Sequence, residues 1–218
     1  MDRRTAALLL VAVVALASVV NATVFAYRWL SGTINIAGPE EASGAACTGF
    51  YSAADQQGIN LPILGTNYDA PTYGLNTITV ETGDVVCQWT YGGKTYYLYE
   101  SIAITIPVTV GSWYIQDFYA FGYYGTETDP TVYVYFRVED DATDGGYLNT
   151  TYLIIRDSGG TEITRLNLLT LGSQTTAIRL SPGSGLRLDL YLDAATSGTV
   201  SFKVGVYVTQ ESGEAPRP

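Results

Sequence analysis

Histidine is absent from this chain of 218 residues, and cysteine, methionine and lysine are rare. Without histidine the chain has no Ser-His-Asp or Cys-His catalytic group and no histidine-ligated zinc. Asp157 begins an Asp-Ser-Gly triplet similar to that of aspartic proteases, but the second triplet that this chemistry needs is missing. Nothing in the sequence selects a carboxylate pair of the kind that glycosidases use. We therefore expect a protein that is not an enzyme.

Basic residues are also scarce, because 11 Lys and Arg stand against 21 Asp and Glu, for a formal net charge of −10. Binding to nucleic-acid phosphates needs clustered Lys and Arg, so nucleic acid is not an expected partner. An acidic surface keeps an exported protein soluble and can also recruit cations.

The one long apolar run lies at the N-terminus, where MDRR precedes TAALLLVAVVALASVV. A short positive segment followed by an apolar one is typical of a secretory signal, and Ala22 and Ala26 each offer a small residue for cleavage. We expect residues 1–26 to be a signal peptide, cut after Ala22 or Ala26, and the protein to be secreted. The alternative is a retained helix that spans a bilayer or forms a pilin stem.

Cys47 and Cys87 are the only two cysteines. In an exported protein two cysteines predict one disulfide, since a reactive thiol would need an activating neighbour that this chain lacks. The loop between them holds about 40 residues, for which the chain-entropy model gives a stabilisation of ~4 kcal/mol.

The body of the chain is rich in residues that favour strands and turns, including 18 Tyr and 23 Gly. Gly92 and Gly93 mark a two-residue hairpin turn, and alternating leucines over residues 186–192 indicate a half-buried strand. We expect an all-β, antiparallel jelly roll or β-sandwich over residues 47–210, followed by a polar tail over 211–218. The expected strands, about ten in number, are residues 76–81, 85–91, 95–110, 113–124, 131–138, 147–156, 162–170, 175–180, 186–192 and 199–209.

Residues 27–37, YRWLSGTINIA, form a strand with nothing nearby in the sequence to pair with. Ile34 and Ile36 share one face of it, and a lone strand must pair with its own sheet or with another chain. The Gly- and Pro-containing linker that follows, residues 38–46, would let it extend for about 36 Å into a neighbouring copy. Head-to-tail donation of a strand makes a filament, whereas insertion into its own sandwich is the ordinary alternative.

The start of the mature chain resembles a known family. Phe25-Ala26-Tyr27 followed by Ser31-Gly32-Thr33-Ile34-Asn35-Ile36 is similar to the beginning of the TasA/camelysin family of biofilm-matrix fibres. Thr82-Gly83-Asp84 is similar to that family's Pro-Gly-Asp turn, and the overall pattern is closer to the archaeal bundling pilins and thread subunits. The stretch before Ser31 is shorter than in TasA, and the cysteine pair is not part of the TasA pattern. Camelysins have been classed as metallopeptidases, but this chain lacks HExxH, so no activity is carried over.

The resemblance implies a jelly-roll subunit whose N-terminal donor strand completes the sheet of the next subunit. The donor residues would be Tyr27, Trp29, Leu30, Thr33, Ile34 and Ile36. We expect a structural subunit of an extracellular filament or pilus that promotes bundling, adhesion and biofilm formation. Its partners would be neighbouring copies, head-to-tail along the filament and laterally between filaments. The alternatives are a surface-anchored sugar-binding or S-layer-associated sandwich, and a type IV-like pilin that keeps its N-terminal helix.

Three further features have two readings each. Glu139, Asp140, Asp141 and Asp144, next to two glycines, form either a weak calcium site or a solvated hairpin loop. No other cofactor is expected. Asn149 begins an Asn-Thr-Thr sequon and is a predicted glycosylation site. The aromatic residues of 113–124 would either stack on sugars or fill the core and an interface between subunits.

Overall fold

The computed structural model describes residues 26–30, 47–51, 72–73, 76–77, 79–91, 93–106 and 108–216. Over these residues the fold is all-β, and the one helical element is a short 3-10 turn at Asp144–Gly146. No helix in these segments has the length and hydropathy that crossing a bilayer requires. The predicted signal segment up to residue 25, the second half of the predicted lead strand and the linker lie outside the described residues.

Two large sheets form the protein, and a small third sheet pairs β3 (Thr72–Tyr73) with β4 (Asn76–Thr77). Sheet A contains, in spatial order, β13 (Ile178–Leu180), β10 (Val132–Asp140), β15 (Lys203–Thr209), β1 (Ala26–Leu30), β8 (Ser101–Thr105) and β5 (Thr79–Thr82). Sheet B contains β12 (Glu162–Asn167), β11 (Leu148–Arg156), β14 (Ser184–Ala194), β9 (Gly111–Tyr124), β2 (Cys47–Tyr51), β7 (Lys94–Tyr99) and β6 (Val85–Tyr91). All pairings are antiparallel except that of β1 with β8.

The core lies between sheets A and B because alternate residues of each strand point to opposite faces. Leu186, Leu188 and Leu190 of β14 are buried as the alternation predicts. Phe121 of β9 meets Phe136 of β10 edge-to-face across the two layers, with ring centroids 6.2 Å apart. One continuous cluster of buried apolar side chains joins both sheets, so the two sheets share a single core.

The all-β, antiparallel prediction is confirmed, but three strand predictions are wrong. Residues 76–81 were expected as one strand and instead form β4 and most of β5, which belong to different sheets. Residues 95–110 were expected as one strand and instead form β7 and β8, which belong to different sheets. The chain bends at Glu100, whose backbone N–H donates to the carbonyl of Asp84. Residues 47–51 are not among the expected strands, yet they form β2, which pairs with β9 in the interior of sheet B. The prediction of β6 over residues 85–91 is confirmed, as is its Gly-Gly hairpin turn to β7.

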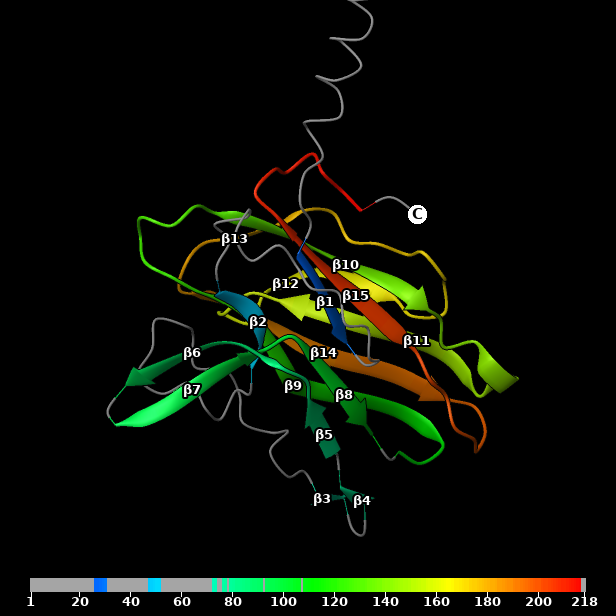
Figure 1. Cartoon of the computed structure of the whole chain (residues 1–218). Coiled ribbons are helices and arrows are strands. Elements are labelled where there is room, and N and C mark those ends of the chain that lie inside the picture. The colour runs from blue at the N-terminus through cyan, green and yellow to red at the C-terminus, as the bar shows by residue number, and fades with distance from the viewer. Residues whose placement is uncertain are drawn as a thin grey trace, which may run out of the picture.

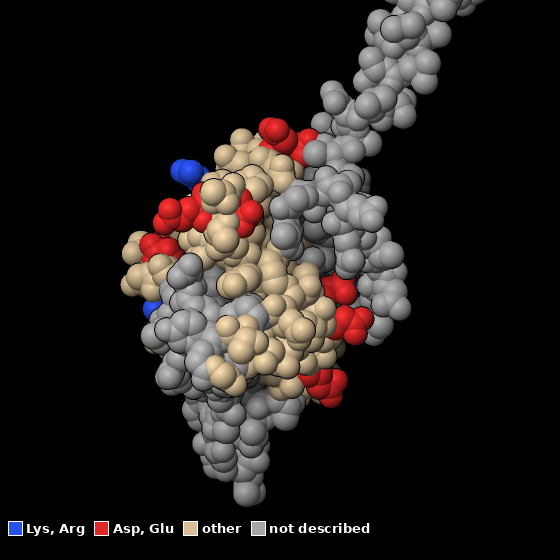
Figure 2. All heavy atoms as spheres, turned by 60° about the vertical axis from the view of Figure 1, so that its left-hand side comes forward, with Lys and Arg blue, Asp and Glu red and all other residues tan. Residues whose placement is uncertain are grey.

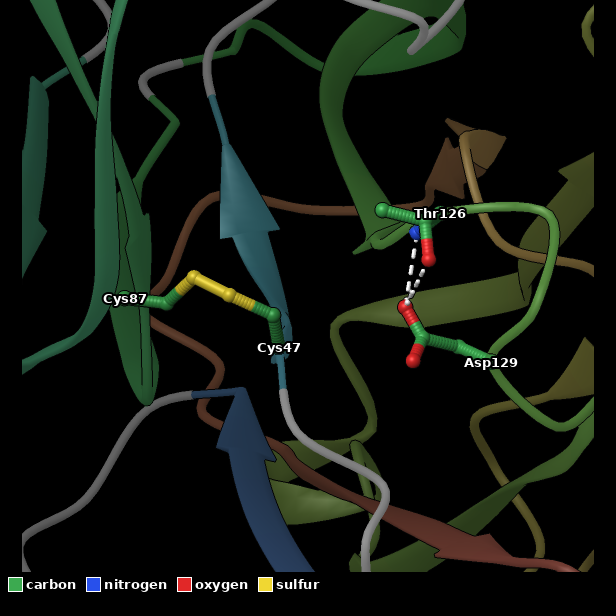
Figure 3. Close-up of a disulfide and its surroundings, with 4 residues drawn as sticks. All are labelled: Cys47, Cys87, Thr126 and Asp129. Atoms are coloured by element: carbon green, nitrogen blue, oxygen red, sulfur yellow. Dashed lines mark hydrogen bonds between the residues drawn. A yellow bond between two sulfur atoms is a disulfide. The ribbon is translucent and has the colours of Figure 1, made fainter.

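The β6–β7 hairpin extends away from the sandwich (Figure 1) and is fastened by the disulfide between Cys47 and Cys87. The two Cα atoms are 5.7 Å apart, and the bond joins β2 to β6 (Figure 3). β2 pairs with β7 only at Phe50 and Tyr99, so few backbone hydrogen bonds hold the hairpin to the sandwich. A small apolar cluster packs beside the disulfide and consists of Tyr51, Tyr96, Leu98, Ala120 and Tyr124.

Replacing both cysteines, as Cys47→Ser with Cys87→Ser, should lower the free energy of unfolding by about 4 kcal/mol, because the loop is no longer closed in the unfolded chain. Urea denaturation of the soluble protein would measure this loss. Reducing agent should destabilise the wild-type protein and leave the double variant unchanged. Equal midpoints for the two proteins without reductant would contradict a structural role for the bond.

Candidate functional site

β1 occupies a slot in the middle of sheet A, between β15 and β8, and we call this position the strand slot. Its residues run antiparallel to β15, from Ala26 opposite Val208 to Leu30 opposite Val204. On the other side Trp29 and Leu30 run parallel to Ser101 and Ile102 of β8. Figure 1 shows β1 alongside β15. Among the described strands, β1 alone connects the β13-β10-β15 half of sheet A to the β8-β5 half.

The strand slot cannot stay empty without a large cost. Val204, Val206 and Val208 of β15 are at most 2% exposed, and Ile102 of β8 is 1% exposed. Without β1, the edges of β15 and β8 would expose backbone N–H and C=O groups, and water would reach these side chains. A strand in this slot is therefore required for sheet A to be continuous.

An apolar groove begins where β1 ends. Beyond Leu30, the next residues along the two flanking segments are Ala103 on β8 and Lys203 at the start of β15. A groove of about 840 Å³ lies in this direction, and both flanking segments line it. On one side it is lined by Ala103, Ile104, Thr105, Ile106, Val108, Thr109 and Val110, and on the other by Thr199, Val200, Ser201 and Phe202.

The floor of this end groove comes from sheet B. Phe118 of β9, Leu190 and Leu192 of β14 and Leu148 of β11 contribute apolar side chains to it. Glu81 is the one charged residue among the lining residues that the structure describes. A segment that entered the groove would therefore meet mainly aliphatic surface, which favours apolar side chains. The strand slot and the end groove together form one continuous track, and β1 occupies the strand-slot part of it.

The predicted donor residues are only partly within the described chain. Tyr27, Trp29 and Leu30 belong to β1, which pairs with strands of its own chain, as in the alternative of insertion into its own sandwich. Thr33, Ile34 and Ile36 lie outside the described residues. Donation of the strand to a neighbouring copy stays a prediction.

Two of the acidic residues predicted to bind calcium, Glu139 and Asp141, are engaged with protein groups. The Glu139 carboxylate accepts a hydrogen bond from the Tyr207 hydroxyl and lies 3.6 Å from Arg137. Asp141 accepts hydrogen bonds from the backbone N–H and the hydroxyl of Thr143. No three acidic side chains gather in a metal-binding arrangement among the side chains that the structure describes. These include Asp140, whereas the side chain of Asp144 lies outside them.

Asn149, the predicted glycosylation site, is exposed near the start of β11. Its side-chain amide donates to Asp193 Oδ2 on the neighbouring strand β14, at 2.9 Å. Ser112 of β9 donates to the other oxygen of the same carboxylate, at 3.0 Å. The sequon therefore lies on the outer face of sheet B, where no core side chain covers it, and glycosylation stays a prediction.

A buried ionic network, which the sequence did not predict, crosses three strands on the outer face of sheet B. Asp189 of β14 is 0% exposed and Asp117 of β9 is 2% exposed. Arg156 Nε donates to Asp189 Oδ2 at 2.6 Å, and Arg187 Nε donates to Asp117 Oδ1 at 2.6 Å. The hydroxyl of Tyr114 donates to Asp189 and accepts from Arg156 Nη2 at 2.8 Å. Each buried carboxylate is thus matched by a guanidinium.

The network also closes a bulge in β9. Leu188 pairs with Tyr119 and Leu190 pairs with Ile115, so residues 116–118 stand opposite Asp189 alone. Within this bulge Asp117 has φ +50°, a left-handed conformation that is unusual for a residue other than glycine. Its backbone N–H donates to Asp189 Oδ1 at 2.7 Å, so the Asp189 carboxylate satisfies a group that the bulge removes from the ladder.

The protonation states suit this arrangement. Burial, followed by the hydrogen bond to Asp189, raises the pKa of Tyr114 above its ordinary value of 10.0, so its hydroxyl remains a donor at neutral pH. The hydrogen bond to Asp189 likewise raises the pKa of Arg156. The sequence pattern alone places these charged residues on one face, because Arg156 of β11 and Arg187 and Asp189 of β14 hold outward positions on neighbouring strands. The alternation indicated solvent exposure for them and could not reveal that they cover one another.

Comparison with known proteins adds no assignment: no protein-family model matches the sequence, and a search of curated proteins finds no match.

Changing Asp189→Asn should lower the free energy of unfolding by about 3 kcal/mol, because it leaves Arg156 without its buried counter-charge. The matched control is Glu162→Gln, which removes an ion pair with Arg165 on the exposed edge strand β12. An exposed pair of this kind contributes less than about 1 kcal/mol. Urea denaturation of both variants would measure the difference, and equal small losses would show that the Asp189 network does not stabilise the fold.

Proposed function

We propose that the protein is a structural subunit of an extracellular filament, in which one copy places its N-terminal strand into the strand slot of the next. The observation that carries this proposal is that a strand from the start of the described chain, Ala26–Leu30, completes the middle of sheet A. A central strand supplied by a terminal segment can be supplied equally well by another copy, because the flanking edges of β15 and β8 recognise backbone groups.

The distance along the chain between β1 and the body supports exchange between copies. β1 ends at Leu30 and β2 begins at Cys47, so sixteen residues separate them. Sixteen residues can span up to about 55 Å when extended, which is more than the width of a domain of this size. The segment is therefore long enough that β1 does not have to pair with its own body.

The end groove supports a donor strand longer than β1. A neighbour's strand that followed the register of β1 and continued past Leu30 would run between residues 103–108 and 199–203. The sequence after Leu30 is SGTINIA, in which Ile34 and Ile36 share one face. The aliphatic lining of the groove suits two such side chains, and the glycine at position 32 adds no bulk at its entrance.

The type of contact allows copies to be joined in a filament. The donated strand and the slot are different surfaces of one molecule, so each copy has one of each to offer. Such a head-to-tail contact leaves a free slot at one end and a free strand at the other, and it propagates unless the rotation closes a ring. Extracellular location, bundling, adhesion and a contribution to biofilm are the wider function that we propose for this assembly.

Crosslinking distinguishes donation between copies from insertion within a copy. Trp29 of β1 lies opposite Ser101 of β8, so a protein carrying both Trp29→Cys and Ser101→Cys brings the new thiols together in either arrangement. After treatment with a short bismaleimide, donation should give a ladder of covalent multimers on a denaturing gel, because each link joins two chains. Insertion within a copy gives only monomers.

The native cysteines do not interfere, since Cys47 and Cys87 are joined to each other. The single variant Trp29→Cys is the control, and it should give no ladder beyond dimers. Electron microscopy of the same sample should show filaments. A sample with filaments whose crosslinks all lie within single chains would overturn strand donation.

A charge in the end groove should block assembly, and circular dichroism of the variant would show whether the subunit itself remains folded. Val200 lines the groove from a segment between strands, so Val200→Asp puts a carboxylate where the donor's isoleucines would pack. Burying that carboxylate unpaired costs several kcal/mol, so we expect filament yield to fall about tenfold or more. The control is Thr128→Asp, an exposed turn position. Light scattering would measure assembly, and an unchanged yield for Val200→Asp would show that the groove takes no donor residues.

A further inference from the structure

Three tyrosines form a straight row across the outer face of sheet B. In register, Tyr152 of β11 lies opposite Tyr191 of β14, and Tyr191 lies opposite Tyr114 of β9. The neighbours of each along its strand point into the core, so the three rings share the opposite face. The planes of Tyr152 and Tyr191 are within 26° of parallel, with centroids 6.4 Å apart. We call this row the tyrosine strip.

The ionic network fixes one end of the strip. The Tyr114 hydroxyl reaches Asp189, which lies one outward position along β14 from Tyr191, so the Tyr114 ring lies along the sheet. Tyr114 is nevertheless 47% exposed, because its ring remains uncovered while its hydroxyl is held. The bulge in β9 and the Asp189–Arg156 pair thereby orient an aromatic surface before any ligand arrives, which reduces the entropy lost on binding.

Hydrogen-bonding groups lie along both sides of the strip. Asp193, Ser112 and Asn149 form one side, in the next row of the sheet, and all three are at least partly exposed. The other side holds the guanidinium of Arg156. At the Tyr152 end, the Arg165 guanidinium lies over the Tyr152 ring, 5.9 Å from its centre.

We propose that the tyrosine strip binds a neutral saccharide, a linear chain of pyranose rings joined through equatorial bonds. Such a chain is a flat ribbon that presents the apolar C–H faces of its rings to aromatic side chains and its hydroxyls to polar groups at either side. The row is straight and spans about 10 Å across three strands, which suits a ribbon lying perpendicular to the strands. Tyr is also well suited to this task, because its ring is rigid and amphipathic.

The charges beside the strip favour this ligand over the other occupants of an aromatic face. Asp193 flanks the row, and the chain carries a net charge of −10, so an anionic polymer would be repelled. The same repulsion opposes the pairing of two identical faces. Figure 2 shows acidic side chains more widespread than basic ones on the surface that it displays. The strip lies on sheet B and the strand slot on sheet A, so a strand in the slot does not cover the strip.

The proposal is tested by calorimetric titration of the full protein with cellohexaose and chitohexaose, which are equatorially linked, and with maltohexaose, whose axial bonds make it coil. We expect at least one of the first two to bind and maltohexaose not to bind. Tyr191→Ala should weaken that binding about tenfold or more, since it removes the middle of the strip. Tyr97→Ala is the matched control, because Tyr97 is 38% exposed on the distant β6–β7 hairpin.

Two further variants keep the test independent of folding. Tyr191→Phe retains the ring and should bind within about twofold of wild type. Tyr114→Phe retains a ring but frees it from Asp189, and it should weaken binding more than Tyr191→Phe does. Absence of binding to both equatorially linked hexaoses would overturn the proposal, as would binding that survives Tyr191→Ala or that is equal for maltohexaose. Loss of filament bundling in Tyr191→Ala, without hexaose binding by wild type, would identify the strip as a protein contact instead.

Discussion

Sheet A depends on the backbone hydrogen bonds of one five-residue strand. β1 provides the partners for the facing edges of β15 and β8, and the residues of β15 that it pairs with include valines that are almost completely buried. Because backbone groups cannot remain unpaired in the middle of a sheet, the slot requires a strand, but it does not require one from the same chain.

The fold was largely predictable from local pattern, and the site only in part. Alternating leucines predicted the strand β14, and the Gly-Gly pair predicted the hairpin turn between β6 and β7. The pattern could not show that the chain passes from one sheet to the other at Glu100, because both halves of residues 95–105 favour strands equally. Nor could it show where β1 inserts, since that depends on contacts with segments about 70 and 180 residues away along the chain.

The Asp117–Asp189 network shows a different limit of sequence reasoning. Outward positions of a strand are expected to be solvated, and Asp189 occupies such a position, yet it is fully buried. Two side chains from the neighbouring strands, Arg156 of β11 and Tyr114 of β9, both donate hydrogen bonds to its carboxylate. The consequence is a rigid outer face on sheet B, where one ionic cluster stabilises a bulge and orients an aromatic ring at the same time.

The two proposals assign strand exchange to sheet A and saccharide binding to sheet B, because the two sheets offer different binding surfaces. Sheet A is continuous only while β1 occupies the strand slot, and the end groove extends the same track, so its natural occupant is an extended peptide. Sheet B is complete in its hydrogen bonding but carries a row of partly exposed tyrosines, so its natural occupant is a flat ligand that needs no backbone pairing. A subunit that polymerises through one sheet and displays the other along the filament would repeat a weak saccharide site many times. Repetition raises the overall affinity through effective concentration, so even millimolar single sites would hold a filament to a surface.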